Sequence, residues 1–207
     1  MAESAKLLSS GLTHLGIDAT AEQQEQLLAY LGLMQKWNKA YNLTAIRDPQ
    51  QMLIRHLLDS LAVVPHINSD ELIDVGSGGG LPGIPLAILF PEQSITTLDS
   101  NSKKTRFQNQ VRIELGLNNL EVIHGRVEAV QDRQFGQVIS RAFASIVDMI
   151  NLSHALLAEK GVFLAMKGRY PDAELAELPP QYVLQQSYEL HVPGLDEERH
   201  LLVLGRA

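Results

Sequence analysis

The sequence predicts an α/β fold in which an N-terminal helical extension precedes a seven-stranded, mostly parallel sheet. Three observations predict this class. Apolar side chains recur at helical spacing over the first seventy residues, whereas short apolar runs alternate with helical segments from residue 71 onward. Strand–helix alternation is typical of a parallel sheet covered by helices on both faces. Two last apolar runs, separated by turn residues, then add a hairpin to one edge.

The extension, residues 1–68, contains two strongly marked helices. The first follows Thr20, which forms a capping-box pattern with Gln23 and precedes a face of apolar residues that ends at Trp37, which we expect to be part of the core. The second follows the cap Asp48, with Pro49 in its first position and an apolar face made by Met52, Leu53, Leu57, Leu58 and Leu61.

His56 and Asp59 lie three residues apart on the second helix, and we expect a structural hydrogen bond between them.

The α/β core, residues 69–207, alternates strands and helices in order. The runs predicted as strands are "ELIDV", "SITTLD", "LEVIHG", "FGQVISRA" and "GVFLAMKG", with helices near 82–90, 101–115 and 145–158. The hairpin is predicted from "QYVLQQSYELHV" and "RHLLVLG". No linker or internal repeat separates the parts, so we expect one domain over residues 1–207.

Composition excludes several kinds of chemistry. The 207 residues include no cysteine, which rules out disulfides, cysteine-ligated zinc, iron–sulfur clusters and a thiol nucleophile. The histidines show no metal-ligand spacing, so no metal is expected. The N-terminus carries no sustained apolar segment and every apolar run is too short to span a bilayer, so we expect a cytoplasmic protein with no membrane partner.

Charge is unevenly distributed along the chain. The net charge is -7, yet residues 101–169 hold ten Lys and Arg against six acids, whereas residues 170–207 hold seven acids against two Arg. A locally basic face on an acidic protein is one interpretation, and an ordinary solvated mixed surface is the other.

The glycine-rich stretch "DVGSGGGLPGIPL", residues 74–86, joins the first strand to the next helix. Its Gly78-x-Gly80-x-x-Gly83 spacing formally matches the dinucleotide-binding motif. In that motif the first glycine closes the strand, so that the pyrophosphate meets the helix N-terminus. Here the strand closes at Gly76, which places the dinucleotide frame two residues too late.

The better frame is Asp74-x-Gly76-x-Gly78-x-Gly80, an acid before three alternating glycines. It resembles motif I of class I S-adenosylmethionine (SAM) methyltransferases. Their cofactor carries a sulfonium and an amino group, both cationic, and a carboxylate at the strand end attracts them. Asp99, at the end of the second strand, is placed to accept both ribose hydroxyl protons of an adenosine cofactor. That contact alone does not distinguish SAM from NAD.

Seven blocks of the sequence together resemble the RsmG/GidB family, bacterial methyltransferases of guanine N7 in small-subunit (16S) ribosomal RNA. The blocks run in matching order from Trp37 to Leu204: "WNKAYNLTAIRDP", "RHLLDSL", "LIDVGSGGGLPGIPLAI", "GRVEAV", "VISRAFAS", "AMKG" and "DEERHLLVL". The resemblance implies a Rossmann-like class I SAM-dependent methyltransferase fold. It further implies that S-adenosyl-L-methionine is held by Gly76, Leu81, Val127, Glu128 and Arg141.

The residues themselves are consistent with this activity. Methylation of a pyrimidine carbon usually needs the absent cysteine, and the stretch after the fourth strand, "ISRAFAS", lacks the proline motif of amino-methylating enzymes. Guanine N7 has a lone pair and no proton, so transfer depends mainly on orientation and needs no general base. No catalytic residue is therefore assigned firmly. Arg141 and Lys167 are candidates for positioning the base, because Arg or Lys is the usual partner of guanine O6.

The expected partner is small-subunit ribosomal RNA, naked or within the ribosomal particle, and nothing in the sequence demands more than a monomer. Candidate RNA contacts lie near the carboxyl edge of the sheet and its hairpin: Lys103, Lys104, Arg106, Arg126, Lys167, Arg199 and His200. For each one alone, a solvated surface charge is an equal alternative. Three other functions stay open, namely a small-molecule methyltransferase, an NAD(P)-dependent oxidoreductase and a noncatalytic SAM-binding module.

Overall fold

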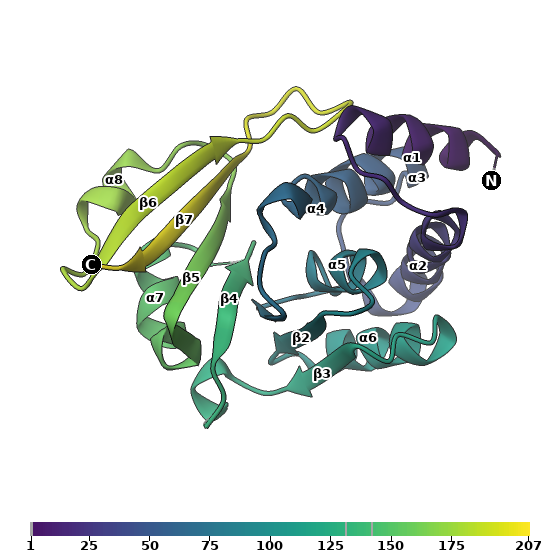
Figure 1. The fold of residues 1–207 in the computed structure, drawn as a ribbon. Helices are drawn as coiled ribbons and strands as arrows, with labels where there is room; N and C mark the ends of the chain where they lie inside the picture. Colours follow the sequence, from purple (N-terminus) through teal and green to yellow (C-terminus); the bar gives the residue numbers. More distant parts are fainter. Residues whose placement is uncertain (1, 131, 142) are drawn as a thin grey trace.

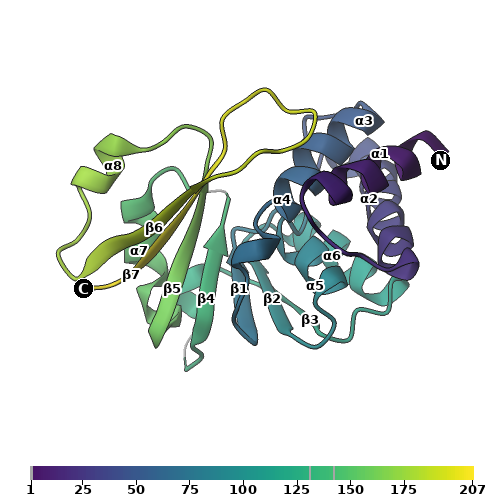
Figure 2. The same ribbon diagram turned by 45° about the horizontal axis from the view of Figure 1, so that its top comes forward.

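The computed structural model describes residues 2–130, 132–141 and 143–207, which include one mixed sheet of seven strands in the order β3-β2-β1-β4-β5-β7-β6 (Figures 1 and 2). Strands β1 to β5 are parallel, whereas β7 is antiparallel to both β5 and β6. The strand bounds are Glu71–Val75 (β1), Ser94–Asp99 (β2), Leu120–His124 (β3), Phe135–Ser140 (β4), Leu157–Lys167 (β5), Tyr182–Glu189 (β6) and His200–Arg206 (β7). The predicted seven-stranded, mostly parallel sheet is confirmed, with the last strand inside the hairpin edge and β6 outermost.

Helices cover both faces of this sheet. On one face lie α5 (Gly83–Leu89), α6 (Ser102–Glu114) and a helical segment over residues 49–61, with α1 (Ala2–His14) and α2 (Ala21–Tyr41) farther out (Figure 2). On the other face lies α7 (Ile146–Ser153), with the short turns η3 (Val127–Ala129) and η4 (His154–Leu156), while α8 (Asp172–Ala176) precedes the hairpin. Among the described residues, no helix is long and apolar enough to cross a membrane.

Two hydrophobic clusters fill the space on the two faces, because side chains alternate across each strand. Leu72 of β1 belongs to the cluster under α5 and α6, and its neighbour Ile73 belongs to the cluster under α7. In β5, Leu164 and Phe163 divide in the same way. The runs read as continuous apolar segments in the sequence because both faces are buried.

The predicted caps of the extension are present. Thr20 and Gln23 form the reciprocal capping box at the start of α2. Trp37 is partly buried against the first cluster, with its ring 5.7 Å from that of Phe107, in agreement with the expected core position.

The segment over residues 49–61 is one continuous helical run with a π-helical turn in its middle. It consists of α3 (Pro49–Met52), the turn η1 (Leu53–Leu58) and α4 (Asp59–Leu61). The expected hydrogen bond between His56 and Asp59 is wrong. His56 Nε2 shares a hydrogen bond with Thr44 Oγ1 at 2.8 Å, and Asp59 pairs with two arginines. In the wider π winding, residues three apart no longer share a face.

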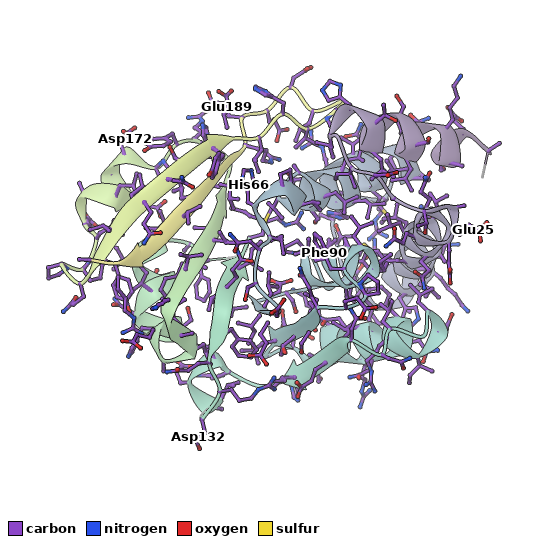
Figure 3. All side chains as sticks on the ribbon, in the orientation of Figure 1. Glu25, His66, Phe90, Asp132, Asp172 and Glu189 are labelled. Atoms are coloured by element: carbon purple, nitrogen blue, oxygen red, sulfur yellow. The ribbon has the colours of Figure 1, made fainter. Side chains whose placement is uncertain are left out.

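The extension is tied to the sheet by polar contacts as well as by the shared first cluster. Gln137 of β4 donates to the His66 carbonyl at 2.9 Å and accepts from the Asn68 N–H at 3.0 Å. The centroid of the His66 ring also lies 3.9 Å from that of Tyr188 in β6; His66 is labelled in Figure 3. A loop that follows the helical segment thus contacts both the middle of the sheet and its hairpin edge.

Candidate functional site

The loop between β1 and α5 has the backbone that its glycines predict. Gly76, Gly78 and Gly80 all have positive φ, at 71°, 59° and 91°. This region of conformational space is strained for residues with a Cβ, and a Cβ on Gly80 would also overlap the side chain of Ile84. The frame that begins at Gly76 is therefore the one that shapes the loop.

Asp74 supports this loop from behind. Its side chain is fully buried, and its Oδ2 accepts a hydrogen bond from the Gly83 N–H at 2.8 Å, at the start of α5. Burial raises the pKa of Asp74 to about 7, although the bond from Gly83 opposes the shift. Because Asp74 occupies the Gly83 N–H at the start of α5, that donor is not free for a pyrophosphate, and the formal dinucleotide match loses its physical basis.

Two cavities lie on either side of Gly76 at the carboxyl ends of the strands. The Asp99 cavity, about 190 Å³, is bordered by the predicted residues Gly76, Asp99, Arg126, Val127 and Glu128. The glycine-loop cavity, about 200 Å³, is bordered by the predicted residues Gly76, Gly78, Leu81, Lys104 and Arg141, and also by Thr44 and His56. Of the predicted cofactor residues, Asp74 and Gly80 border neither cavity, and both shape the loop instead.

Asp99 organises the backbone between the two cavities. Its Oδ2 accepts from the Gly78 N–H at 2.7 Å and its Oδ1 from the Asn101 N–H at 2.8 Å, so it holds the glycine loop and the start of α6 together. Only 9% of the residue is exposed. Each carboxylate oxygen can accept a second hydrogen bond, which leaves capacity for a pair of ligand hydroxyls.

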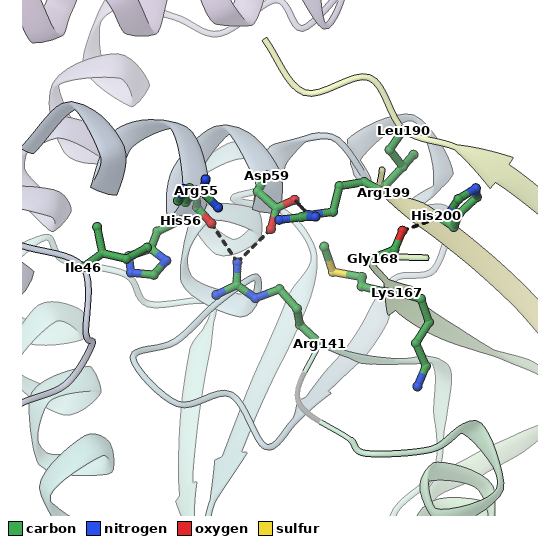
Figure 4. A pocket seen from close by; sticks show the side chains of 11 residues that line it. Ile46, Arg55, His56, Asp59, Arg141, Lys167, Gly168, Leu190, Arg199 and His200 are labelled. Atoms are coloured by element: carbon green, nitrogen blue, oxygen red, sulfur yellow. Dashed lines mark hydrogen bonds and ion pairs between the residues drawn. The ribbon is translucent and has the colours of Figure 1, made fainter. Parts of the chain in front are cut away.

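A larger cavity of about 370 Å³ adjoins the glycine-loop cavity and shares two residues with it, His56 and Arg141 (Figure 4). We call it the basic cavity, because its lining includes four cationic side chains: Arg55, Arg141, Lys167 and Arg199. His200 completes its outer wall, where its Nδ1 hydrogen-bonds with the Gly168 carbonyl at 3.0 Å.

Asp59 is the acidic residue in the lining of the basic cavity. It is 3% exposed and accepts from Arg141 Nη1 at 3.1 Å and from Arg199 Nε at 2.9 Å. Figure 4 shows it between the two guanidinium groups. Lys167 extends away from this group and pairs with Glu174 at 2.8 Å.

His56 carries no charge at the junction of the two cavities. Burial, together with the nearby positive charge of Arg141, lowers the pKa of His56 to about 4. The imidazole is therefore neutral at physiological pH, and the Thr44 hydroxyl fixes its orientation.

The structure separates the predicted RNA contacts into two groups. Lys104, Arg126, Lys167, Arg199 and His200 border one of the three cavities, whereas Lys103 and Arg106 are exposed on α6 and border none of them.

Sequence reasoning missed Arg55 and Thr44, and it gave His56 and Asp59 only a structural role. The available signal was the presence of four polar residues, Arg55, His56, Asp59 and Ser60, among the leucines of "RHLLDSL". Among the described residues, no cluster of His, Asp and Glu is suited to hold a metal ion.

The sequence was compared with known families and proteins. A family model, GidB, described as rRNA small subunit methyltransferase G, matches residues 23–202. A "Ribosomal RNA small subunit methyltransferase G" of Marinobacter nauticus is 55% identical over 97% of this chain and 94% of its own length. The protein of the same name from Pseudomonas syringae pv. syringae is 56% identical over 98% of this chain and 95% of its own.

Solved structures with much lower sequence identity share the fold. A SAM-dependent methyltransferase from Thiobacillus denitrificans, solved with S-adenosyl-L-homocysteine, has a TM-score of 0.54 at 13% identity and covers 84% of this chain and 98% of its own. TrmN from Thermus thermophilus has a TM-score of 0.58 at 16% identity, covering 73% of this chain, which spans about half of TrmN (48%). The fold is thus the Rossmann-like fold of class I SAM-dependent methyltransferases.

Proposed function

Because the chain belongs to the GidB family, rRNA small subunit methyltransferase G, we propose that it transfers a methyl group from SAM to N7 of a guanine in 16S ribosomal RNA. One observation supports this function above the others. The glycine-loop cavity and the basic cavity share His56 and Arg141, so a methyl donor in the first lies directly beside an acceptor in the second.

The residues around Gly76 fit the two halves of SAM. The Asp99 cavity offers a buried carboxylate for the ribose hydroxyls, and it offers the Val127 side chain and the Glu128 backbone to the adenine. The glycine-loop cavity then takes the methionine part, with Gly76, Gly78 and Leu81 along its wall.

Arg141 borders the far side of the glycine-loop cavity, while Asp74 and Gly80 act indirectly by setting the loop conformation.

The chain contributes orientation rather than proton transfer. When bound, SAM supplies a methyl group on a sulfonium, which passes to N7 while its carbon–sulfur bond breaks with the electron pair on sulfur. N7 carries no proton, so the site needs no general base. A neutral His56 fits this role, because it forms a fixed side wall where the two cavities meet without adding positive charge beside a sulfonium.

We assign the RNA contacts by which cavity, if any, each residue borders. Lys167, Arg199 and His200 line the basic cavity and are placed for the target nucleotide. Lys104 and Arg126 border the cofactor cavities, and Lys103 and Arg106 extend the positive surface along α6, where they would meet phosphates. Bases in single-stranded or looped RNA can be splayed into such a cavity. We expect the enzyme to act as a monomer, in the cytoplasm where ribosomes are assembled.

The direct test is methyl transfer itself. The purified chain would be incubated with methyl-labelled SAM and either naked small-subunit RNA or small-subunit particles, and the RNA digested to nucleosides. Labelled 7-methylguanosine is expected from at least one substrate. No label at guanine N7 in either would overturn the proposal, and label confined to a metabolite extract would instead indicate a small-molecule methyltransferase.

A further inference from the structure

Asp59 joins three segments that are far apart in the sequence. It lies in the helical segment over residues 49–61, Arg141 follows β4, and Arg199 immediately precedes β7. Both carboxylate oxygens are used, one by each guanidinium, at 3.1 Å and 2.9 Å. A nearly buried carboxylate is costly unless it is paired, so this arrangement is strongly preferred over one with a free Asp59.

The pairing fixes the direction of Arg141 in particular. Arg141 Nη1 donates to the Arg55 carbonyl at 3.3 Å as well as to Asp59, so two acceptors on the same helical segment hold one end of the guanidinium. Arg199 holds the other oxygen of Asp59 and thereby limits rotation of the carboxylate. The orientation of Arg141 therefore depends on Asp59 as well as on the Arg55 carbonyl.

Arg141 also lies where a guanine would be read. It borders both the glycine-loop cavity and the basic cavity, whereas Arg199 borders only the basic cavity of the two. The acceptor edge of guanine carries N7 and O6 side by side. The N7 lone pair must stay free for the methyl group, so a donor at this junction is useful only if it engages O6.

We propose that Arg141 donates to O6 of the target guanine and that Asp59 is the positioning residue that holds Arg141 in place to do so. This inference rests on the proposed function. The inference explains how the site would select guanine. Adenine places its N6 amino donor where Arg141 also donates, and any base without O6 offers the guanidinium no acceptor.

The first experiment uses the wild-type chain and changes the base. Small-subunit RNA is prepared by ligation with the methylated guanine replaced by inosine, which keeps O6, or by 2-aminopurine, which lacks it; both keep N7. We expect inosine to be methylated within about threefold of guanine and 2-aminopurine at least tenfold more slowly in kcat/KM. Equal use of guanine and 2-aminopurine would overturn the role of O6.

The second experiment changes Asp59. In Asp59→Asn the side-chain size is kept and the charge is lost, so we expect kcat/KM for guanine to fall at least tenfold and the preference over 2-aminopurine to shrink. Affinity for SAM, measured by calorimetry, should fall by a clearly smaller factor than kcat/KM, because Leu81, Asp99 and Val127 still border the cofactor cavities. The matched control is Glu197→Gln, which removes a half-exposed carboxylate that pairs with Arg55 and Arg199 but does not line the basic cavity, and it should change each quantity less than threefold.

A readout independent of turnover follows the Arg141 Nη1–H that bonds to Asp59. Its NMR signal, assigned by its loss in Arg141→Lys, should exchange slowly with solvent in wild type and in Glu197→Gln, and quickly in Asp59→Asn. An unchanged signal in Asp59→Asn, or a loss of SAM affinity as large as the loss of activity, would overturn the positioning role. If the wild-type chain forms no 7-methylguanosine, the proposed function and this inference are both overturned. If wild type is active and Asp59→Asn is equally active, only the inference is overturned.

Discussion

Asp99 accepts hydrogen bonds from the backbone and is also proposed to bind the ribose, and a substitution affects both roles. Its carboxylate already accepts the N–H groups of Gly78 and Asn101, and we propose that its remaining lone pairs accept the ribose hydroxyls. An amide in its place turns one acceptor into a donor that faces a backbone N–H. The substitution therefore destabilises the glycine loop as well as the binding of the ligand.

Asp99→Asn should weaken SAM binding by about 1.5–3 kcal/mol, or roughly ten- to a hundredfold in Kd, because a charge-assisted hydrogen bond is lost. Asp99→Ala should weaken it at least as much. Calorimetric titration with SAM measures the effect, and Asp148→Asn, on the exposed surface of α7, is the control. An affinity equal to wild type would show that Asp99 does not bind the ribose.

Asp74 and His56 should give opposite pH dependences of folding stability. The native pKa of Asp74 is raised from 3.8 to about 7, so the native state holds the proton more tightly and stability falls as pH rises between these values. The native pKa of His56 is lowered from 6.5 to about 4, so the unfolded state holds the proton more tightly and stability falls as pH drops from 6.5 to 4.

The two contributions oppose each other between about pH 4 and 6.5 in the wild type. Asp74→Asn should leave a free energy of unfolding that rises with pH in this window, and His56→Gln one that falls with pH. Urea denaturation at several pH values measures both. Parallel curves for the two variants would contradict the burial of these groups.

At the element scale, the turn from β1 to α5 depends on close packing as well as on positive φ. Gly83 has no room for a side chain, because a Cβ would overlap the Thr97 side chain and lie 3.0 Å from Asp74 Oδ2. The third glycine of the formal dinucleotide match thus has a purely structural role here: it lets α5 approach β2.

Gly83→Ala should destabilise the protein by about 1–3 kcal/mol, as expected for an overpacked site. The matched control is Gly32→Ala in α2, where a Cβ meets nothing within 4 Å and replacement in a helix interior should stabilise by about 0.5–1 kcal/mol. Urea denaturation of both variants gives the comparison. Equal free energies of unfolding for the two variants would show that a methyl group fits at position 83, contrary to the close packing in the structure.

At the scale of the whole molecule, the extension and the sheet share one hydrophobic cluster. Leu31 of α2 and Leu58 of the helical segment belong to the same cluster as Ile139 of β4 and Leu164 of β5. We therefore propose that residues 1–207 fold as a single unit, although the chain can be divided at residue 68 by its pattern of elements.

The chain should unfold in one cooperative transition. Trp37 is the single tryptophan and lies in the extension, so its fluorescence reports on the extension while far-ultraviolet circular dichroism reports on all helices and strands. We expect the two signals to have the same urea midpoint. A fluorescence transition clearly separated from the dichroism transition would instead show that the extension is an independent domain.

The sequence by itself determined the elements and the family. Caps, periodicity and glycine spacing act over a few residues, so Thr20 with Gln23, the frame from Gly76 to Gly80, and the strand order along the chain were all predictable, and the seven quoted blocks pointed to GidB. It also placed Asp99, Val127 and Glu128 near one another, because parallel strands end at a common edge.

Only the tertiary structure decided what Asp59 does. Its partners Arg141 and Arg199 lie 82 and 140 residues farther along the chain, and no local pattern encodes such pairings. The π-helical turn that separates His56 from Asp59 and the full burial of Asp74 likewise depend on what packs around them. Local interactions set where helices and strands form, whereas burial and charge pairing between distant segments set which side chains meet in the basic cavity.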